Sequence, residues 1–357
     1  MPNDVIIAHR EIGPSRKPFV IAEMSGNHNQ SLERALAIVE AAALAGVDAL
    51  KLQTYTADTM TLDLNRDEFT ISDKKSLWYG KSLYELYREA YTPWEWHEPI
   101  MRRCRELGLI VFSTPFDETA VEFLESLKVP AYKVASFENT DLSLIRRIAR
   151  TGKPMIISTG MASVEELYEA VDAARAAGCA DLILLKCTSS YPASAEHSNL
   201  NTIPDMIRRF DLPVGLSDHT IGVEVALAAV GLGASVIEKH FTLNRSDGGP
   251  DAAFSLEPPE MSQLAAGVAK AWQALGRVTY GTTESEKRSI QFRRSLYVVA
   301  DVKAGDCLTK TNLRAIRPGF GLPPKHYDQL LGQRVTRDIA KGTPVTWEIV
   351  QPKGESK

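Results

Sequence analysis

The sequence predicts a (β/α)8 barrel, an α/β fold of the TIM-barrel type, followed by a small β-rich domain. In the first 280 residues, eight short apolar runs each precede an amphipathic helical stretch, and eight such units close a parallel barrel. The apolar runs alternate little, as expected of strands that are buried on both faces. After Tyr280 this pattern stops, and closely spaced turns begin.

The predicted strands and helices alternate along the chain. We expect strands at 19–24, 49–53, 109–113, 131–135, 154–158, 181–186, 213–216 and 235–239, and helices at 32–45, 94–107, 118–127, 142–150, 164–177, 203–209, 223–232 and 259–275. A long insertion separates the second strand from its helix. Glycines such as Gly46 and Gly178 end helices just before the next strand. An open doubly wound sheet competes with the barrel, but no GxGxxG follows the first strand.

Three segments are expected along the chain. They are a barrel domain at 1–280, a polar linker at 281–291 and a C-terminal domain at 292–357. The barrel pattern does not continue in the C-terminal domain. The C-terminal domain has short strand-like runs between turns, as at 304–306 and 341–343. A module of about 65 residues is marginally stable alone, so we expect it to dock on something larger.

Composition and charge exclude several classes of protein. The net charge of −4 and the lack of a basic run disfavour nucleic acid or an anionic membrane as a partner. The four cysteines have no CxxC spacing, which indicates a reducing compartment. The N-terminus has no signal-peptide pattern, and no apolar run approaches the ~20 residues of a membrane span. We therefore expect a cytoplasmic protein.

Unusual polar residues gather at the carboxyl ends of the predicted strands, where the loops of a barrel converge around one mouth. They include Glu23, Lys51, Gln53, Thr114, Lys133, Ser136, Glu138, Ser158, Ser189, Tyr191, Ser217, His219, Glu238 and His240. An isolated Ser or Thr there is more often a helix cap, but caps do not explain all eight strands together. Lys51 and Lys133 lie in apolar strands, where a buried phosphate or carboxylate would offset the cost of an unpaired ammonium.

The two histidines of this set end adjacent strands. His219 and His240 could hold a divalent metal or form a hydrogen-bonded structural pair, and the spacing leaves both readings open. Glu23 is a candidate acid or base. The set indicates an enzyme that acts on a small phosphorylated carboxylate and a carbonyl partner.

Several motifs in order along the chain resemble the sialic acid synthase family. They are AEMSGNHNQ at 22–30, KLQTY at 51–55, STPFD at 113–117, KVAS at 133–136, ISTGM at 157–161, CTSSYP at 187–192, GLSDHT at 215–220, EKHFT at 238–242, GGPDAAFSLEP at 248–258 and RPGFGLPP at 317–324. The resemblance implies a barrel followed by a SAF (antifreeze-like) domain. It also implies a transferase that condenses phosphoenolpyruvate with an open-chain N-acyl amino sugar and releases phosphate.

The same resemblance implies roles for individual residues. Catalysis is expected of Glu23, Lys51, Lys133 and Asp251, and substrate binding of Gln53, Thr114, Ser136, Ser158, Ser189, Tyr191, Ser217 and Arg317. His219 and His240 would hold a divalent cation, Mn2+ or Mg2+, with Co2+ as a further candidate. Arg317 would reach the sugar bound by a partner subunit, because the family forms domain-swapped dimers.

Departures from the commonest family pattern indicate the sugar. The chain has Met24, Ser25 and Gly26 where the family typically has IGI, Ser189 where Asn is usual, and Ala252 where His is usual. These features look like the branch that makes pseudaminic acid from 2,4-diacetamido-2,4,6-trideoxy-β-L-altropyranose. A synthase for sialic or legionaminic acid is the nearest rival. A non-catalytic carbohydrate-binding protein and a Schiff-base aldolase using Lys133 or Lys51 are the alternatives of other classes.

Overall fold

The computed structural model describes residues 2–64 and 66–351, so the end of the predicted C-terminal domain, 352–357, lies outside the described residues. The chain divides into two compact units, Met1–Gly276 and Arg277–Lys357. Each unit has its own hydrophobic core. The boundaries predicted at 280 and 292 stay predictions. Within the described ranges, no helix is long and apolar enough to cross a membrane.

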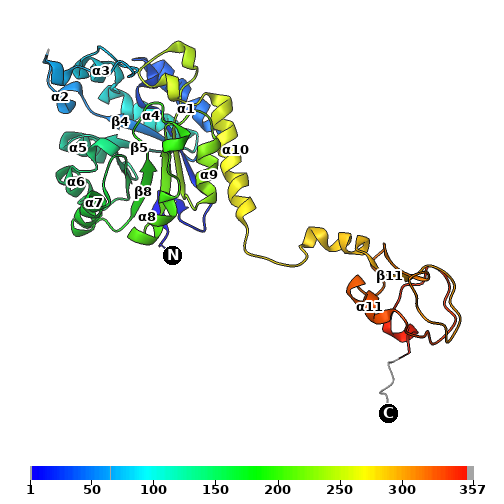
Figure 1. Ribbon diagram of the computed structural model, residues 1–357. Coiled ribbons are helices and arrows are strands. Elements are labelled where there is room, and N and C mark those ends of the chain that lie inside the picture. The colour runs from blue at the N-terminus through cyan, green and yellow to red at the C-terminus, as the bar shows by residue number, and fades with distance from the viewer. Residues whose placement is uncertain (1, 65, 352–357) are drawn as a thin grey trace. The chain divides into compact units, whose positions relative to one another are not determined.

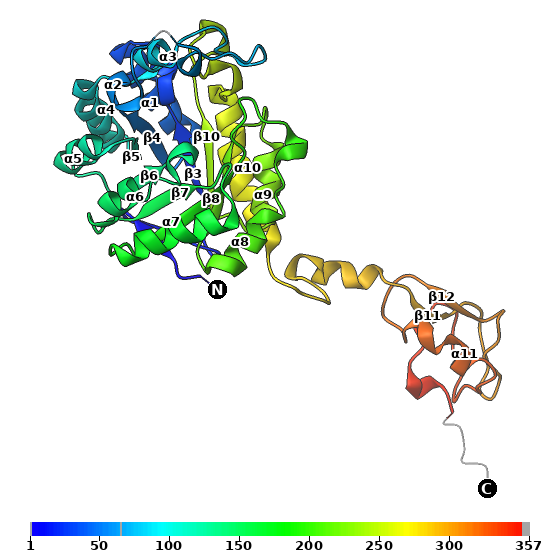
Figure 2. The same ribbon diagram turned by 60° about the vertical axis from the view of Figure 1, so that its left-hand side comes forward.

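The first unit is a closed barrel of eight parallel strands in the cyclic order β10-β3-β4-β5-β6-β7-β8-β9 (Figures 1 and 2). The strands are β3 (Phe19–Glu23), β4 (Ala49–Thr54), β5 (Ile110–Pro115), β6 (Tyr132–Val134), β7 (Met155–Ser158), β8 (Leu182–Cys187), β9 (Val214–Asp218) and β10 (Val236–His240). The predicted (β/α)8 fold is therefore confirmed, and strand bounds differ from prediction by one or two residues.

Helices follow the strands around the outside of the barrel (Figure 1). They are α1 (Leu32–Ala45), α4 (Trp94–Glu106), α5 (Glu118–Ser126), α6 (Leu142–Ala149), α7 (Val164–Ala176), α8 (Thr202–Phe210), α9 (Glu224–Gly231) and α10 (Pro258–Leu275). Local signals fix their ends. The side chain of Ser31 caps α1 by accepting a hydrogen bond from the Arg34 N–H, and Gly46 ends α1 with a φ of 79° that suits glycine.

Two features of the barrel unit were not predicted from the sequence. A hairpin of β1 (Val5–Ile7) and β2 (Arg10–Ile12) precedes the barrel, and its apolar side chains join the cluster that fills the barrel interior. The insertion after β4 contains α2 (Ala57–Met60), a short 3-10 turn η2 (Asp67–Phe69) and α3 (Leu83–Ala90). The strands β1 and β2 and the helix α2 are too short to show a clear hydrophobic period, whereas α3 lies in the stretch that the prediction left as one long insertion.

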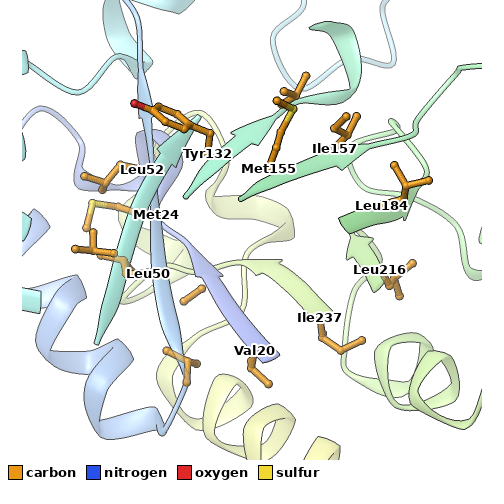
Figure 3. Packing of buried hydrophobic residues seen from close by; sticks show 14 of the residues in the cluster. Val20, Met24, Leu50, Leu52, Tyr132, Met155, Ile157, Leu184, Leu216 and Ile237 are labelled. Carbon is orange, nitrogen blue, oxygen red and sulfur yellow. The ribbon is translucent and has the colours of Figure 1, made fainter. Parts of the chain in front are cut away.

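Alternate residues of each barrel strand enter two different cores. Outward residues pack against the surrounding helices, and Figure 3 shows several of them, including Val20, Leu50 and Ile237. Inward residues such as Ile21 and Ala49 fill the barrel with the hairpin side chains. This alternation follows from the period of two in a strand, and it decides which polar residues can face the mouth.

The second unit is small and built from short antiparallel pieces. After a 3-10 helix, η7 (Glu284–Phe292), β11 (Ser295–Val298) pairs with β12 (Leu313–Ile316), and isolated bridges connect the rest. A short helix, α11 (Tyr327–Leu330), and two 3-10 turns, η8 (Pro324–His326) and η9 (Trp347–Ile349), complete it. The predicted β-rich domain is confirmed. Most of the segment predicted as a linker forms η7, whose first residues carry a Thr283–Glu286 capping box.

Candidate active site

Strand alternation places four ionisable residues inside the barrel at its carboxyl end. Each lies two positions beyond an apolar residue of the interior cluster, so it points to the same side. The pairs are Ile21 and Glu23, Ala49 and Lys51, Ala131 and Lys133, and Val236 and Glu238. The apolar layers therefore end in a charged layer that forms the floor of the mouth.

One part of this charged layer is an ion pair between β3 and β4. Lys51 Nζ lies 2.6 Å from Glu23 Oε2, and it donates to Thr114 Oγ1 at 3.2 Å. Gln53 Nε2 donates to the other oxygen of Glu23 at 3.0 Å. Burial raises the pKa of Glu23. Burial alone would lower the pKa of Lys51, but the nearby carboxylates raise it on balance, which keeps the ammonium charged.

A second part joins Lys133 and Glu238. Lys133 Nζ donates to Ser158 Oγ at 2.6 Å and lies 3.8 Å from Glu238 Oε1. Ser217 donates to the same oxygen at 3.0 Å. Burial lowers the pKa of Lys133. Burial opposes ionisation of Glu238, yet the two lysines lower its pKa, so this carboxylate is held charged between them.

Hydroxyl groups surround the lysine ends of this layer. Ser136 Oγ accepts a hydrogen bond from the Gly160 N–H at 3.2 Å. A Cβ at Gly160 would collide with the hydroxyls of both Ser136 and Ser189, so glycine keeps this pocket open. Hydroxyls and ammonium groups at one place can donate to the oxygens of a phosphate or carboxylate.

Two imidazoles lie at the other side of the mouth. The rings of His219 and His240 are 5.3 Å apart between centroids, and His219 Nδ1 lies 3.1 Å from the Thr188 carbonyl oxygen. His240 Nδ1 is buried with no hydrogen-bond partner among the described residues, and it lies 3.9 Å from Asp251 Oδ2. Burial lowers the pKa of His240 well below its usual value, which leaves a neutral ring nitrogen with a free lone pair.

The two imidazoles can bind a divalent cation, although protein side chains alone are too few to complete its coordination. Within the described part of the chain, no three His, Cys, Asp or Glu side chains are grouped as a metal site. An orphaned, buried imidazole nitrogen beside a carboxylate is the kind of donor that borderline cations take. His219 and His240 would hold the cation, and substrate or water oxygens would complete its coordination.

A cavity of about 510 Å³ opens above the charged layer. Ser25, Gln53, Ser189, His240 and Asp251 are among the residues that line it. Ser25 donates to the carboxylate of Asp251, whose pKa is raised by burial. The ring of Tyr191 lies 4.5 Å from His219 between centroids and also packs against Phe254. A polar ligand in this cavity would meet aromatic faces beside the imidazoles.

The structure brings most of the predicted site residues together. Those in the barrel mouth are Glu23, Lys51, Gln53, Thr114, Lys133, Ser136, Ser158, Ser189, Tyr191, Ser217, His219, His240 and Asp251. Arg317 instead lies in the second unit, exposed just after β12. The roles assigned to all of these residues stay predictions.

The sequence analysis gave no role to two residues of the mouth, although both stand at predicted strand ends. The spacing of two between Glu238 and His240 puts these side chains on the same face. Glu138 lines the cavity, and burial raises its pKa to about 7. Among the described residues its Oε2 atom has no hydrogen-bond partner.

Fold and site define a TIM-barrel enzyme with a charged floor of lysines and carboxylates and with paired imidazoles. Residues 38–280 match the NeuB family and 293–351 match the SAF domain. The chain belongs to the NeuB family.

Relatives extend this result over nearly the whole chain. The pseudaminic acid synthase of Campylobacter jejuni subsp. jejuni is 43% identical over 92% of this chain and 95% of its own. That of Helicobacter pylori is 42% identical over 94% of this chain and 98% of its own. The crystal structure of a sialic acid synthetase from Leptospira borgpetersenii matches with a TM-score of 0.73 at 29% identity, covering 81% of this chain and 96% of that one.

Proposed function

We propose that the protein is a pseudaminic acid synthase. It condenses phosphoenolpyruvate with 2,4-diacetamido-2,4,6-trideoxy-β-L-altropyranose and water, and releases phosphate. The observation that carries this proposal is the 43% identity to a pseudaminic acid synthase along 92% of the chain, together with an intact charged layer in the mouth. The departures at Ser189 and Ala252 support the same branch.

Phosphoenolpyruvate binds at the lysine end of the mouth. Lys51 and Lys133 face its phosphate and carboxylate, and the hydroxyls of Thr114, Ser136, Ser158, Ser189 and Ser217 donate to the remaining oxygens. The fixed ammonium groups stabilise the charge that develops as the phosphate leaves. An anion also relieves the cost of holding two buried lysines so close together.

The amino sugar binds in the cavity with its open-chain aldehyde toward the imidazoles. His219 and His240 would hold a divalent cation, which would supply Lewis-acid polarisation of the aldehyde oxygen. The C3 carbon of phosphoenolpyruvate attacks the aldehyde carbon, water adds at C2, and phosphate leaves with cleavage of the C2–O bond. Glu23 and Asp251 lie at either side of this centre, where they hold or pass protons.

The site is completed by a second copy of the chain. Arg317 is exposed in the C-terminal unit, so it is free to contact the N-acyl group of a sugar held by a partner subunit in a domain-swapped homodimer. Its guanidinium would donate to the acyl oxygen. We place the enzyme in the cytoplasm, where phosphoenolpyruvate is available, with no nucleic acid or membrane as partner.

The test is phosphate release from phosphoenolpyruvate with Mn2+, using the diacetamido-trideoxy-altrose, N-acetylmannosamine and the legionaminic acid precursor in parallel. Turnover of the altrose with the expected product mass is the predicted result. Preferred turnover of another sugar would contradict the proposed substrate. Binding of a sugar without phosphate release would favour a carbohydrate-binding protein, and a borohydride-trapped adduct on Lys133 or Lys51 would favour an aldolase.

A further inference from the structure

The insertion between β4 and α4 supplies much of the lining of the cavity. Five of its apolar side chains are here called the insertion wall: Met60, Ile71, Trp78, Leu83 and Leu86. Other parts of the lining carry the polar groups beside the imidazoles. A ligand that fills the cavity therefore meets both polar groups and apolar carbon.

Three polar residues of the insertion also line the cavity: Asp73, Ser76 and Tyr87. The first two are engaged with the backbone of their own turn. Asp73 Oδ1 accepts from the Lys75 N–H at 2.9 Å, and Ser76 Oγ accepts from the Trp78 N–H at 3.2 Å. Their oxygens are therefore partly satisfied before any ligand binds.

Trp78 fixes the insertion wall to the reaction end. Its Nε1–H donates to the Pro250 carbonyl oxygen at 2.7 Å, across 172 residues of chain. Its ring also lies 5.8 Å from that of Tyr191 between centroids. Asp251 follows Pro250 directly, so one indole both forms part of the wall and holds the segment that carries the proposed sugar-handling carboxylate.

The aldehyde sets the orientation of an open-chain sugar in this cavity. If C1 lies at the imidazoles, then C4, C5 and C6 reach toward the insertion. The proposed altrose has a methyl group at C6 and an acetamido group at C4, whereas N-acetylmannosamine has hydroxyls at both positions. A methyl group gains from burial against apolar side chains, while a hydroxyl there loses its hydrogen bonds to water.

We propose that the insertion wall selects the sugar by its deoxygenated C6 end, with Trp78 positioning the wall over the reacting centre. This inference rests on the proposed function and names the part of the site that sets its sugar specificity. An apolar pocket rejects a substrate with one added hydroxyl by about a hundredfold at most, so the expected preference is tenfold to a hundredfold.

The experiment compares kcat/KM for the 6-deoxy altrose and for the same diacetamido sugar bearing a 6-hydroxyl. The wild-type enzyme should prefer the 6-deoxy sugar by at least tenfold. Leu83→Asn and Ile71→Asn each offer an amide to the 6-hydroxyl, and they should reduce the preference several-fold without changing KM for phosphoenolpyruvate. Leu77→Asn is the matched control, because Leu77 lies in the same insertion, is 47% exposed and does not line the cavity. It should leave the preference unchanged.

A second pair of variants tests the positioning role of Trp78. Trp78→Phe keeps an apolar ring but removes the N–H that holds Pro250, so it should raise KM for the sugar while retaining the 6-deoxy preference. Trp78→Ala should lose the preference as well. Equal wild-type rates with both sugars, or an unchanged preference in both asparagine variants, would overturn the inference. No phosphate release with any sugar would instead overturn the proposed function.

Discussion

The charged floor of the mouth and the insertion wall belong to the same end of the barrel but are built in opposite ways. Floor residues such as Lys51 and Lys133 sit on barrel strands, are almost fully buried, and are fixed by ion pairs and hydroxyls. The insertion wall sits on a long connection, and a hydrogen bond from Trp78 fastens it to the loop after β10. Chemistry and sugar choice therefore reside in different structural layers, so mutations should affect them separately.

The largest effect is expected from the floor. Lys133→Ala removes the ammonium that contacts Ser158 and Glu238, and it leaves the buried carboxylate with less compensation. We expect kcat/KM to fall about a thousandfold, because stabilisation of developing charge is lost. Steady-state phosphate release measures this, with the exposed Arg102→Ala as control. Unaltered kinetics for phosphoenolpyruvate would remove Lys133 from the anion site.

A buried ion pair on the faces of β9 and β10 that point away from the charged floor should affect the stability of the protein and not its catalysis. Lys239 Nζ donates to Asp218 Oδ2 at 2.8 Å and to the Thr220 carbonyl oxygen at 2.6 Å. Lys239→Met leaves Asp218 unpaired, which should lower the free energy of unfolding by about 3 kcal/mol.

Urea denaturation measures this loss, and the sugar preference of the surviving folded enzyme should stay as in the wild type. The exposed Lys270→Met is the control and should change stability by less than about 0.5 kcal/mol. If Lys239→Met lowered the free energy of unfolding as little as the control does, the ion pair of Lys239 and Asp218 would contribute little to stability.

Glu138 lines the cavity, and its ionisation should make the stability of the protein depend on pH. Burial raises its pKa to about 7 from 4.5, so the folded protein binds more protons than the unfolded chain between these values. The free energy of unfolding therefore falls as pH rises from 4.5 to 7. Glu138→Gln should remove about 2 kcal/mol of this fall.

Urea titrations at pH 5 and pH 8 measure the change, with the exposed Glu169→Gln as control. The same dependence on pH in Glu138→Gln and wild type would mean that the carboxyl group ionises as it does in the unfolded chain.

The smallest effect is expected of Arg317 in the second unit. Arg317→Ala should raise KM for the sugar about tenfold and leave KM for phosphoenolpyruvate nearly unchanged, because the proposed contact is to the acyl oxygen of the sugar. Kinetics with each substrate varied in turn separate the two. A larger effect on phosphoenolpyruvate would contradict a role for Arg317 at the sugar.

The sequence by itself determined the barrel and most of the candidate mouth. Each barrel strand and the main helix after it follow from a local apolar pattern, and each strand end marks the mouth. Glu23, Lys51 and His240 could therefore be found without coordinates. Even Glu238 was within reach, because a strand period of two places it with His240. These features depend on neighbours in the chain, which a sequence displays directly.

Only the tertiary structure decided what meets across the mouth. Two lysines approach Glu238 from distant strands, and Trp78 donates a hydrogen bond to Pro250 far along the chain. The folded surroundings also leave His240 Nδ1 without a partner among the described residues. The apolar wall of the insertion draws on residues spread from Met60 to Leu86, so it forms only when the insertion folds. Such contacts depend on the geometry of the closed barrel, which brings together strand ends and loops that no local pattern relates.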